Sequence, residues 1–137
     1  MINIKYKMEG TKLYKYRELC TDLKLTCCKN ANRAIDFMKT NHKHSNLLGK
    51  YVELHIIMEK LCDYTMKCCC LTEVISKHTI YDIAEKCKEI IKLSGELDKV
   101  LNKKESEYLR CQEIIDLAKS LLSKSIVNNK KTKKTNL

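Results

Sequence analysis

Residues that could bind a soft metal ion recur along this chain of 137 residues. The chain contains nine cysteines, and several of them keep the three-and-four spacing that places residues on one face of a helix. Thiolate and thioether sulfur favour Cu(I), and thiolate and imidazole also bind Zn(II). The candidate ligands on such faces are Cys20, Cys27, His55, Cys62, Met66, Cys69, Cys87 and Cys111. One hypothesis is therefore a cytosolic, thiol-based helical bundle that binds Cu(I) or Zn.

The same residues also suit the packed interior of a protein that binds no metal or other cofactor. A reduced cysteine behaves as a small hydrophobe and methionine fills irregular gaps, so both are common on the buried face of a helix. The odd number of cysteines, and their clustering at 27–28 and 68–70, do not resemble a disulfide framework. Packing is our first interpretation, and it predicts that six reduced thiols are mostly buried: Cys20, Cys27, Cys62, Cys69, Cys87 and Cys111.

Basic residues gather at the two ends of the chain. Residues 1–45 carry ten Lys or Arg and four Asp or Glu, residues 46–127 carry thirteen of each kind, and residues 128–137 carry four Lys. Lysine outnumbers arginine 24 to 3, and lysine offers a point charge rather than the two-pronged contact that reads a base. We therefore expect nonspecific attraction to nucleic acid or to an acidic surface. The candidate contacts are Lys15, Lys29, Arg33, Lys130, Lys131, Lys133 and Lys134.

The sequence lacks the motifs of an enzyme. It contains no glycine-rich phosphate loop, no nucleophile elbow and no pair of catalytic carboxylates, and its acidic residues mostly alternate with lysine as on solvated helix faces. No apolar run reaches the length of a membrane span, and the first ten residues lack the apolar core of a signal peptide. We expect a non-enzymatic, intracellular protein, cytoplasmic or nuclear, with no membrane span.

A helical rhythm of apolar residues predicts the elements that would position these side chains. The rhythm indicates helices over about 12–40, 47–71, 79–101 and 106–127, and the chain has no proline and only three glycines. Residues that could cap the later helices are Ser45 or Asn46, Thr79 and Ser106. The prediction is an all-α fold, an antiparallel up-down four-helix bundle. Alternatively, the last two helices are fused into one long helix in a dimer, because the apolar phase continues across 102–105.

The predicted organisation is an N-terminal extension at 1–10, one helical bundle domain at 11–127 and a disordered basic tail at 128–137. The function we expect is a non-enzymatic helical interaction module that binds a protein partner through a helix face, with basic ends that attract acidic partners. The alternatives are the thiol-based metal-binding bundle and a basic protein that associates nonspecifically with nucleic acid. A homodimer is also compatible with the sequence.

Overall fold

The computed structural model describes the backbone of residues 10–72 and 75–135 and the side chains of residues 12–68 and 75–125. Within these ranges every regular element is an α-helix, as the sequence predicted. The helices are α1 (Gly10–Thr40), α2 (Ser45–Thr72), α3 (Lys77–Val100), α4 (Lys103–Leu109) and α5 (Cys111–Thr135). The described part of the chain is therefore all-α, with five helices where we predicted four.

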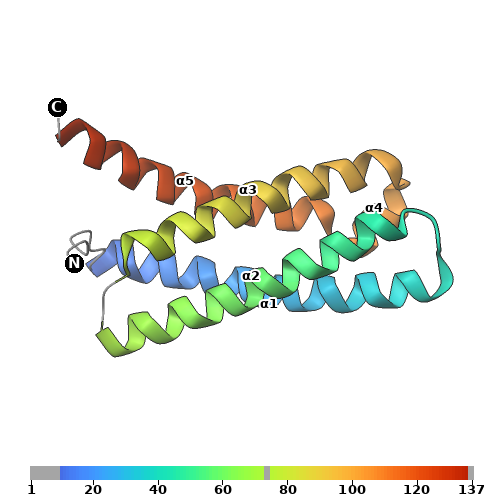
Figure 1. Ribbon diagram of the computed structural model, residues 1–137, viewed down its shortest axis with the longest axis horizontal. Coiled ribbons are helices and arrows are strands. Elements are labelled where there is room, and N and C mark those ends of the chain that lie inside the picture. Colours follow the sequence, from blue (N-terminus) through green and yellow to red (C-terminus); the bar gives the residue numbers. More distant parts are fainter. Residues whose placement is uncertain (1–9, 73–74, 136–137) are drawn as a thin grey trace.

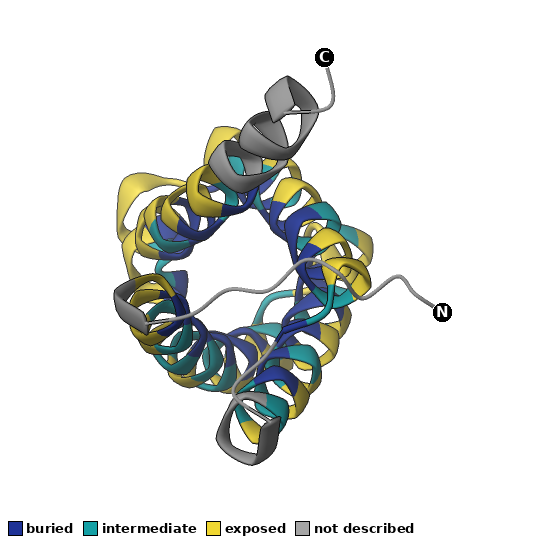
Figure 2. Cartoon of the chain, turned by 90° about the vertical axis from the view of Figure 1, so that its left-hand side faces the viewer, coloured by how far each residue is buried: buried dark blue, intermediate teal, exposed yellow. Residues whose placement is uncertain are grey.

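The four long helices α1, α2, α3 and α5 lie side by side and alternate in direction along the chain (Figure 1). The most extensive packing joins α1 to α2 and α3 to α5, and the two resulting helical pairs meet along an α2–α3 seam and an α1–α5 seam. Seen along the helix axes, the helices form a ring whose buried residues face inward (Figure 2). None of the helices in the described part of the chain is long and apolar enough to cross a membrane.

The break after α3 contradicts the fused-helix alternative. Leu101 leaves α3 with extended backbone, and Asn102 begins α4 through a reciprocal capping box. Asn102 Oδ1 accepts from the Glu105 backbone N–H at 2.8 Å, and a Glu105 carboxylate oxygen accepts from the Asn102 backbone N–H at 3.0 Å. Arg110, with a left-handed φ of 57°, then separates α4 from α5. The predicted cap Ser106 is therefore wrong, because Asn102 together with Glu105 satisfies two backbone donors where a lone serine satisfies one.

The start of α3 also differs from the prediction. Ser76, and not Thr79, is its N-cap, and the Ser76 side chain accepts from the Thr79 backbone N–H at 3.2 Å. Thr79 thus lies inside the first turn, where its own hydroxyl lies 2.9 Å from Ser76 Oγ. The predicted turn before α2 is present, and His44 adopts a left-handed φ of 60° in it. The predicted caps Ser45 and Asn46 are wrong, because α2 already begins at Ser45 and both residues lie in its first turn.

The last helix is longer than expected. We predicted an end near Val127 and disorder beyond it, whereas the backbone of α5 is helical to Thr135. Residues 128–135 contain neither proline nor glycine, and lysine both favours helix and suits the negative end of the helix dipole. The predicted extension at 1–10 lies outside the described residues except for Gly10, which begins α1.

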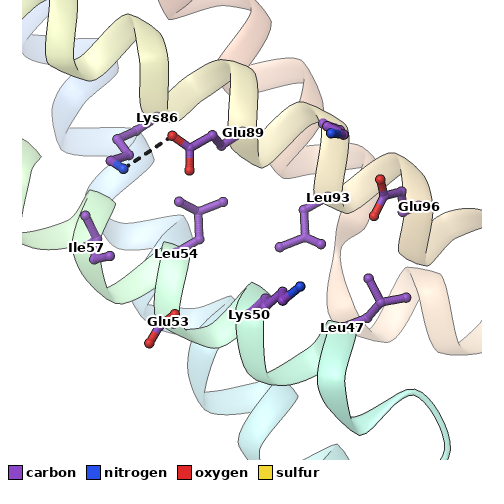
Figure 3. Close-up of a pocket in the computed structure, with 10 residues that line it drawn as sticks. Leu47, Lys50, Glu53, Leu54, Ile57, Lys86, Glu89, Leu93 and Glu96 are labelled. Carbon is purple, nitrogen blue, oxygen red and sulfur yellow. Dashed lines mark hydrogen bonds and ion pairs between the residues drawn. The ribbon is translucent and has the colours of Figure 1, made fainter.

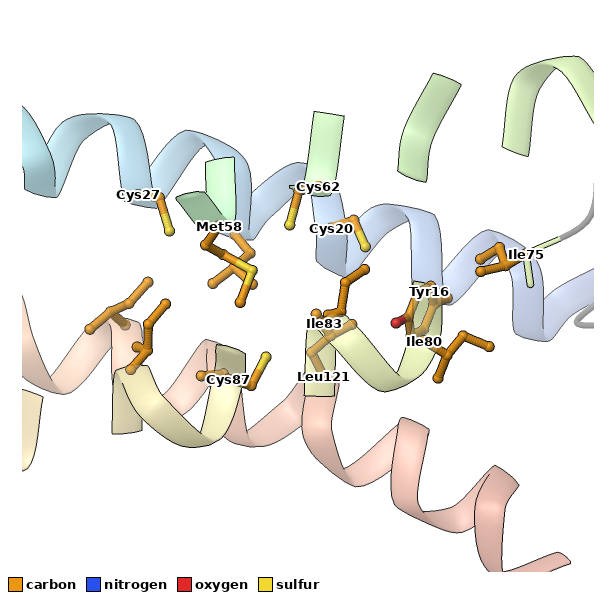
Figure 4. Close-up of a cluster of buried hydrophobic side chains, with 14 of the residues drawn as sticks. Tyr16, Cys20, Cys27, Met58, Cys62, Ile75, Ile80, Ile83, Cys87 and Leu121 are labelled. Atoms are coloured by element: carbon orange, nitrogen blue, oxygen red, sulfur yellow. The ribbon is translucent and has the colours of Figure 1, made fainter. Parts of the chain in front are cut away.

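The interior consists of two apolar clusters arranged along the helices. The first cluster extends over the half of the fold where α1 begins, and its members include Tyr16, Cys20, Cys27, Met58, Cys62, Ile75, Ile80, Ile83, Cys87 and Leu121 (Figure 4). The second cluster lies at the end where α4 joins α5, and it comprises Ala34, Leu48, Tyr51, Leu97, Leu101, Leu109 and Cys111.

Candidate protein-binding groove

The predicted interior thiols are buried. Five of the six are fully shielded from solvent, and they come from four different helices: Cys20, Cys27, Cys62, Cys87 and Cys111. The side chain of the sixth, Cys69, lies outside the described residues. The burial prediction is confirmed for the five, because each keeps the phase of the apolar stripe on its own helix.

The same thiols do not converge on one point. Among the described residues, no three His, Cys, Asp or Glu side chains form a group that could hold a metal ion. Cys27, Cys62 and Cys87 point into the first cluster around Met58 (Figure 4), while Cys111 belongs to the second cluster. The predicted ligand set is therefore divided between two regions of the interior.

Two further candidate ligands, Met66 and His55, have other contacts. Met66 packs against the first cluster, and its sulfur accepts a hydrogen bond from the Thr21 hydroxyl at 3.5 Å. His55 is fully buried, and its Nδ1 lies 2.7 Å from the Tyr51 carbonyl oxygen. Burial lowers the pKa of His55 to about 4, with the bond to Tyr51 opposing that shift. His55 is therefore a neutral interior residue at physiological pH.

Burial also controls the reactivity of the interior thiols. It raises the pKa of Cys27 far above the ordinary thiol value, and the neighbouring Cys62 and Cys87 raise it further. Burial raises the pKa of Cys87 to about 12 and likewise raises the pKa of Cys111. Only the thiolate is a good nucleophile or metal ligand. These thiols consequently stay protonated and unreactive at neutral pH.

The basic residues predicted on α1 do not form one continuous patch. Arg33 donates to the Tyr108 carbonyl oxygen at 3.2 Å and lies over the Tyr108 ring, 5.7 Å from its centroid. Lys29 lines a hollow in the α1–α5 seam together with acidic Asp22, Glu113 and Asp116. Lys15 is exposed nearer the start of the helix. The side chains of the tail lysines, Lys130, Lys131, Lys133 and Lys134, lie outside the described residues.

A groove of about 620 Å³ runs along the α2–α3 seam (Figure 3). Its floor is apolar and is made by Leu47, Leu54, Ile57 and Leu93. Its rim is charged and is made by Lys50, Glu53, Lys86, Glu89, Lys92 and Glu96. Leu54 and Leu93 also contact the clusters of the interior, so the groove floor is continuous with the core.

The spacing of residues on both walls explains the groove. The α2 wall uses positions 47, 50, 54 and 57, and the α3 wall uses 86, 89, 93 and 96, so each set lies on one face of its helix. Because α2 and α3 belong to different helical pairs and pack less extensively than either pair, these faces stay open. Ile57 remains 42% exposed, and Tyr64, two turns further along α2, is 60% exposed. Exposed apolar surface with a polar rim is typical of binding sites.

The rim carries both signs of charge in equal number, three lysines and three glutamates. Lys86 Nζ and a Glu89 carboxylate oxygen form an ion pair at 3.3 Å, which Figure 3 shows on the α3 wall. On the α2 wall Lys50 precedes Glu53, and on the α3 wall Lys86 and Glu89 precede Lys92 and Glu96, so lysine and glutamate alternate in position along the rim. The rim therefore offers a partner both charge signs in a defined order.

Sequence reasoning did not single out the groove. The available signal was a set of apolar residues, Leu47, Leu54 and Ile57, beside the predicted core stripe of α2, which makes the apolar face wider than a single buried stripe requires. Comparison with protein-family models, with curated proteins and with solved structures finds no match to this chain. The groove is therefore the feature of the molecule from which a function can be inferred.

Proposed function

We propose that this protein is a non-enzymatic interaction module, a four-helix bundle with α4 as a short connecting helix, that binds a helical segment of a protein partner in the α2–α3 groove. The observation that carries the proposal is the solvent-open apolar floor between two charged walls. A groove of this kind buries the apolar face of an amphipathic helix and orients it through the rim.

A helix suits the groove better than an extended peptide does. Both walls present side chains at intervals of three and four residues, and a bound helix presents anchors at the same intervals. No strand edge occurs among the described residues to pair with an extended chain. At 1.5 Å per residue, the stretch from Leu47 to Ile57 measures roughly 15 Å, or about three turns of a bound helix.

The chemistry of the lining supports binding. The lining contains only leucine, isoleucine, lysine and glutamate, a composition that supplies apolar contact and charge but no Ser, Cys or His nucleophile or base. Because His55 and five of the thiols are enclosed in the interior, and no thiol lines the groove, we propose no catalytic step for this protein. The proposal assigns the protein to the inside of the cell, cytoplasm or nucleus, where reduced cysteines persist.

The basic ends have an auxiliary role in this proposal. Lys130, Lys131, Lys133 and Lys134, with the N-terminal lysines, would attract acidic partners or nucleic acid through charge alone. Such attraction falls steeply with salt, because it depends on released counterions. Contact in the groove depends mainly on apolar burial, and salt should affect it much less.

A selected helical peptide tests the proposal. A library of peptides with apolar residues at i, i+3, i+4 and i+7 is selected against the protein, and the dissociation constant of the best binder is measured by calorimetry. Ile57→Glu should weaken binding by more than about tenfold, because it places a charge on the apolar floor. Ile35→Glu is the matched control, since Ile35 on α1 is 43% exposed and lies outside the groove.

The outcomes separate the alternatives. Equal binding by wild type and Ile57→Glu, with both variants folded as judged by circular dichroism, would contradict the groove as the binding site. Failure of the selection to yield any binder would also contradict it. Sedimentation equilibrium of the wild-type protein in the same buffer reports whether the protein self-associates, and a dimer that Ile57→Glu dissociates would place a second copy in the groove.

A further inference from the structure

Three fully buried polar residues lie between the two apolar clusters: Asn30 on α1, His55 on α2 and Ser94 on α3. Each is flanked on its own helix by one member of either cluster: Cys27 and Ala34 around Asn30, Tyr51 and Met58 around His55, and Ile90 and Leu97 around Ser94. The three residues therefore form a polar layer at the junction of the clusters.

The hydrogen bonds of Tyr51 determine the donor direction at Asn30 and His55. The Leu109 carbonyl can only accept, so the Tyr51 hydroxyl donates to it, at 2.8 Å. The amide Nδ2 of Asn30 then donates to the Tyr51 hydroxyl oxygen, at 3.3 Å. The Tyr51 carbonyl can also only accept, so Nδ1 of the neutral His55 ring carries the proton and donates to it, at 2.7 Å. Both ambiguous side chains, the amide and the imidazole, thus have one orientation and one tautomer.

Two acceptor atoms and one hydroxyl group of these three residues take part in none of these hydrogen bonds. They are Asn30 Oδ1, His55 Nε2 and Ser94 Oγ, and none has a hydrogen-bond partner among the described residues. The His55 and Tyr51 ring centroids are 4.0 Å apart, and Asn30 is bonded to the same tyrosine, so both acceptors lie close to Tyr51. Buried polar atoms are nearly always hydrogen-bonded, because an unpaired one lowers stability.

We propose that Asn30, His55 and Ser94 form a buried binding site for one water molecule that joins α1, α2 and α3. The water donates one hydrogen to Asn30 Oδ1 and the other to His55 Nε2, and it accepts the hydrogen of the Ser94 hydroxyl. Three hydrogen bonds are the usual number for a buried water. A single molecule thereby satisfies all three atoms.

The site lies beneath the α2–α3 groove. His55 falls within the stretch of α2 that forms one wall, 47–57, and Ser94 falls within the stretch of α3 that forms the other, 86–96. The bound water therefore connects the two walls from the inside and holds them at a fixed separation. This effect on partner binding rests on the proposed function, whereas the existence of the site does not.

Nuclear magnetic resonance of the full-length protein tests the site directly. Side-chain nitrogen shifts should show His55 protonated on Nδ1 at pH 7, because that atom donates to the Tyr51 carbonyl. Cross-relaxation between water and the His55 ring protons should reveal a water molecule of long residence time. A ring protonated on Nε2, or the absence of a long-lived water at His55, would overturn the proposal.

A pair of serine variants supplies the control. Ser94→Ala removes one of the three partners, so it should abolish or strongly weaken the water signal at His55 and raise the unfolding equilibrium constant by about tenfold. Ser125→Ala removes an equally buried serine whose hydroxyl donates to the Leu121 carbonyl at 3.1 Å within α5. It should leave the water signal at His55 unchanged. The same water signal in both variants contradicts the role of Ser94 and with it the proposed site.

Peptide binding separates this inference from the proposed function. A long-lived water at His55 in a protein that binds no helical peptide supports the site and contradicts the proposed function. Peptide binding that Ile57→Glu abolishes, in a protein without the water signal, supports the proposed function and contradicts the site.

Discussion

The first cluster and the α2–α3 groove share helices α2 and α3 but differ in what they expose. The first cluster contains thiols with potential chemistry, Cys27, Cys62 and Cys87, and encloses them completely. The groove contains only leucine, isoleucine, lysine and glutamate and is open to solvent. The residue types that could bind a metal or react therefore lie in the closed cluster, whereas the surface that a partner can reach lies in the groove. Accessibility therefore decides where a partner can bind, and burial makes these three thiols part of the core.

The neighbouring residues Met58 and Ile57 give the sharpest contrast between the two regions. Met58 is fully buried in the first cluster, while Ile57 is 42% exposed on the groove floor. Met58→Ala should lower the free energy of unfolding by about 2–5 kcal/mol, because it leaves a cavity. Ile57→Ala should change it by only about 0.5 kcal/mol. Denaturant unfolding followed by circular dichroism measures both, and equal losses would remove the distinction between core and groove.

The pH dependence of stability tests the polar layer between the clusters. Burial holds the pKa of His55 at about 4, whereas an unfolded histidine titrates near 6.5, so unfolding takes up a proton between these values. The contribution of neutral His55 to the free energy of unfolding is fully present above about pH 6.5, and it decreases as the pH falls toward 4. At about 1.4 kcal/mol per pH unit the total loss is about 3 kcal/mol.

Comparison with His55→Leu isolates this contribution, because carboxylates such as Asp63 titrate in both proteins. The pKa of Asp63 is lowered chiefly by its hydrogen bond from Lys24, at 2.7 Å, and its effect cancels in the difference. The unfolding free energy of the wild type minus that of His55→Leu should therefore decrease steadily as the pH falls from 6.5 to 4.5, because only the wild type loses the contribution of His55. A difference that stays constant over this range would show that His55 is already solvated in the folded protein.

The adjacent thiols of Cys27 and Cys28 provide a smaller, local contrast. Cys27 is fully buried with a raised pKa, and Cys28 is only half-buried. A thiol reagent should therefore modify Cys28 at least roughly tenfold faster than Cys27 in the native protein. Peptide mass spectrometry measures both rates, and Cys28→Ser serves to assign the fast site. Equally fast labelling of both cysteines would contradict the enclosed first cluster.

Much of the fold could be predicted from the sequence because helix formation and burial on a stripe are local properties. The three-and-four spacing located the long helices and the buried positions of Cys20, Cys62 and Cys87. The capping residues were harder to predict, because several polar residues near each helix boundary could act as the N-cap. Asn102 and not Ser106 is the N-cap of α4, because Glu105 completes a capping box with Asn102.

The groove and the polar layer could not be predicted from the sequence, because both depend on distances between helices. The groove exists since α2 and α3 belong to separate helical pairs, and no periodicity within α2 reveals that separation. The polar layer requires Tyr51 to reach the Leu109 carbonyl from α2. The sequence favoured an interior position for His55 over a metal ligand, and the structure buries the ring and bonds it to its own helix, but the tyrosine that joins it to Asn30 could not be foreseen.

Chemical-shift mapping is the most direct test of the claim that function resides in the groove. The isotope-labelled protein is titrated with the selected helical peptide, and the amide shifts of every residue are followed. We expect the largest changes in residues 47–57 and 86–96, the two walls of the groove. Those changes should disappear in Ile57→Glu and persist in Ile35→Glu. Changes concentrated in the α1–α5 seam or in the basic ends would contradict binding in the groove.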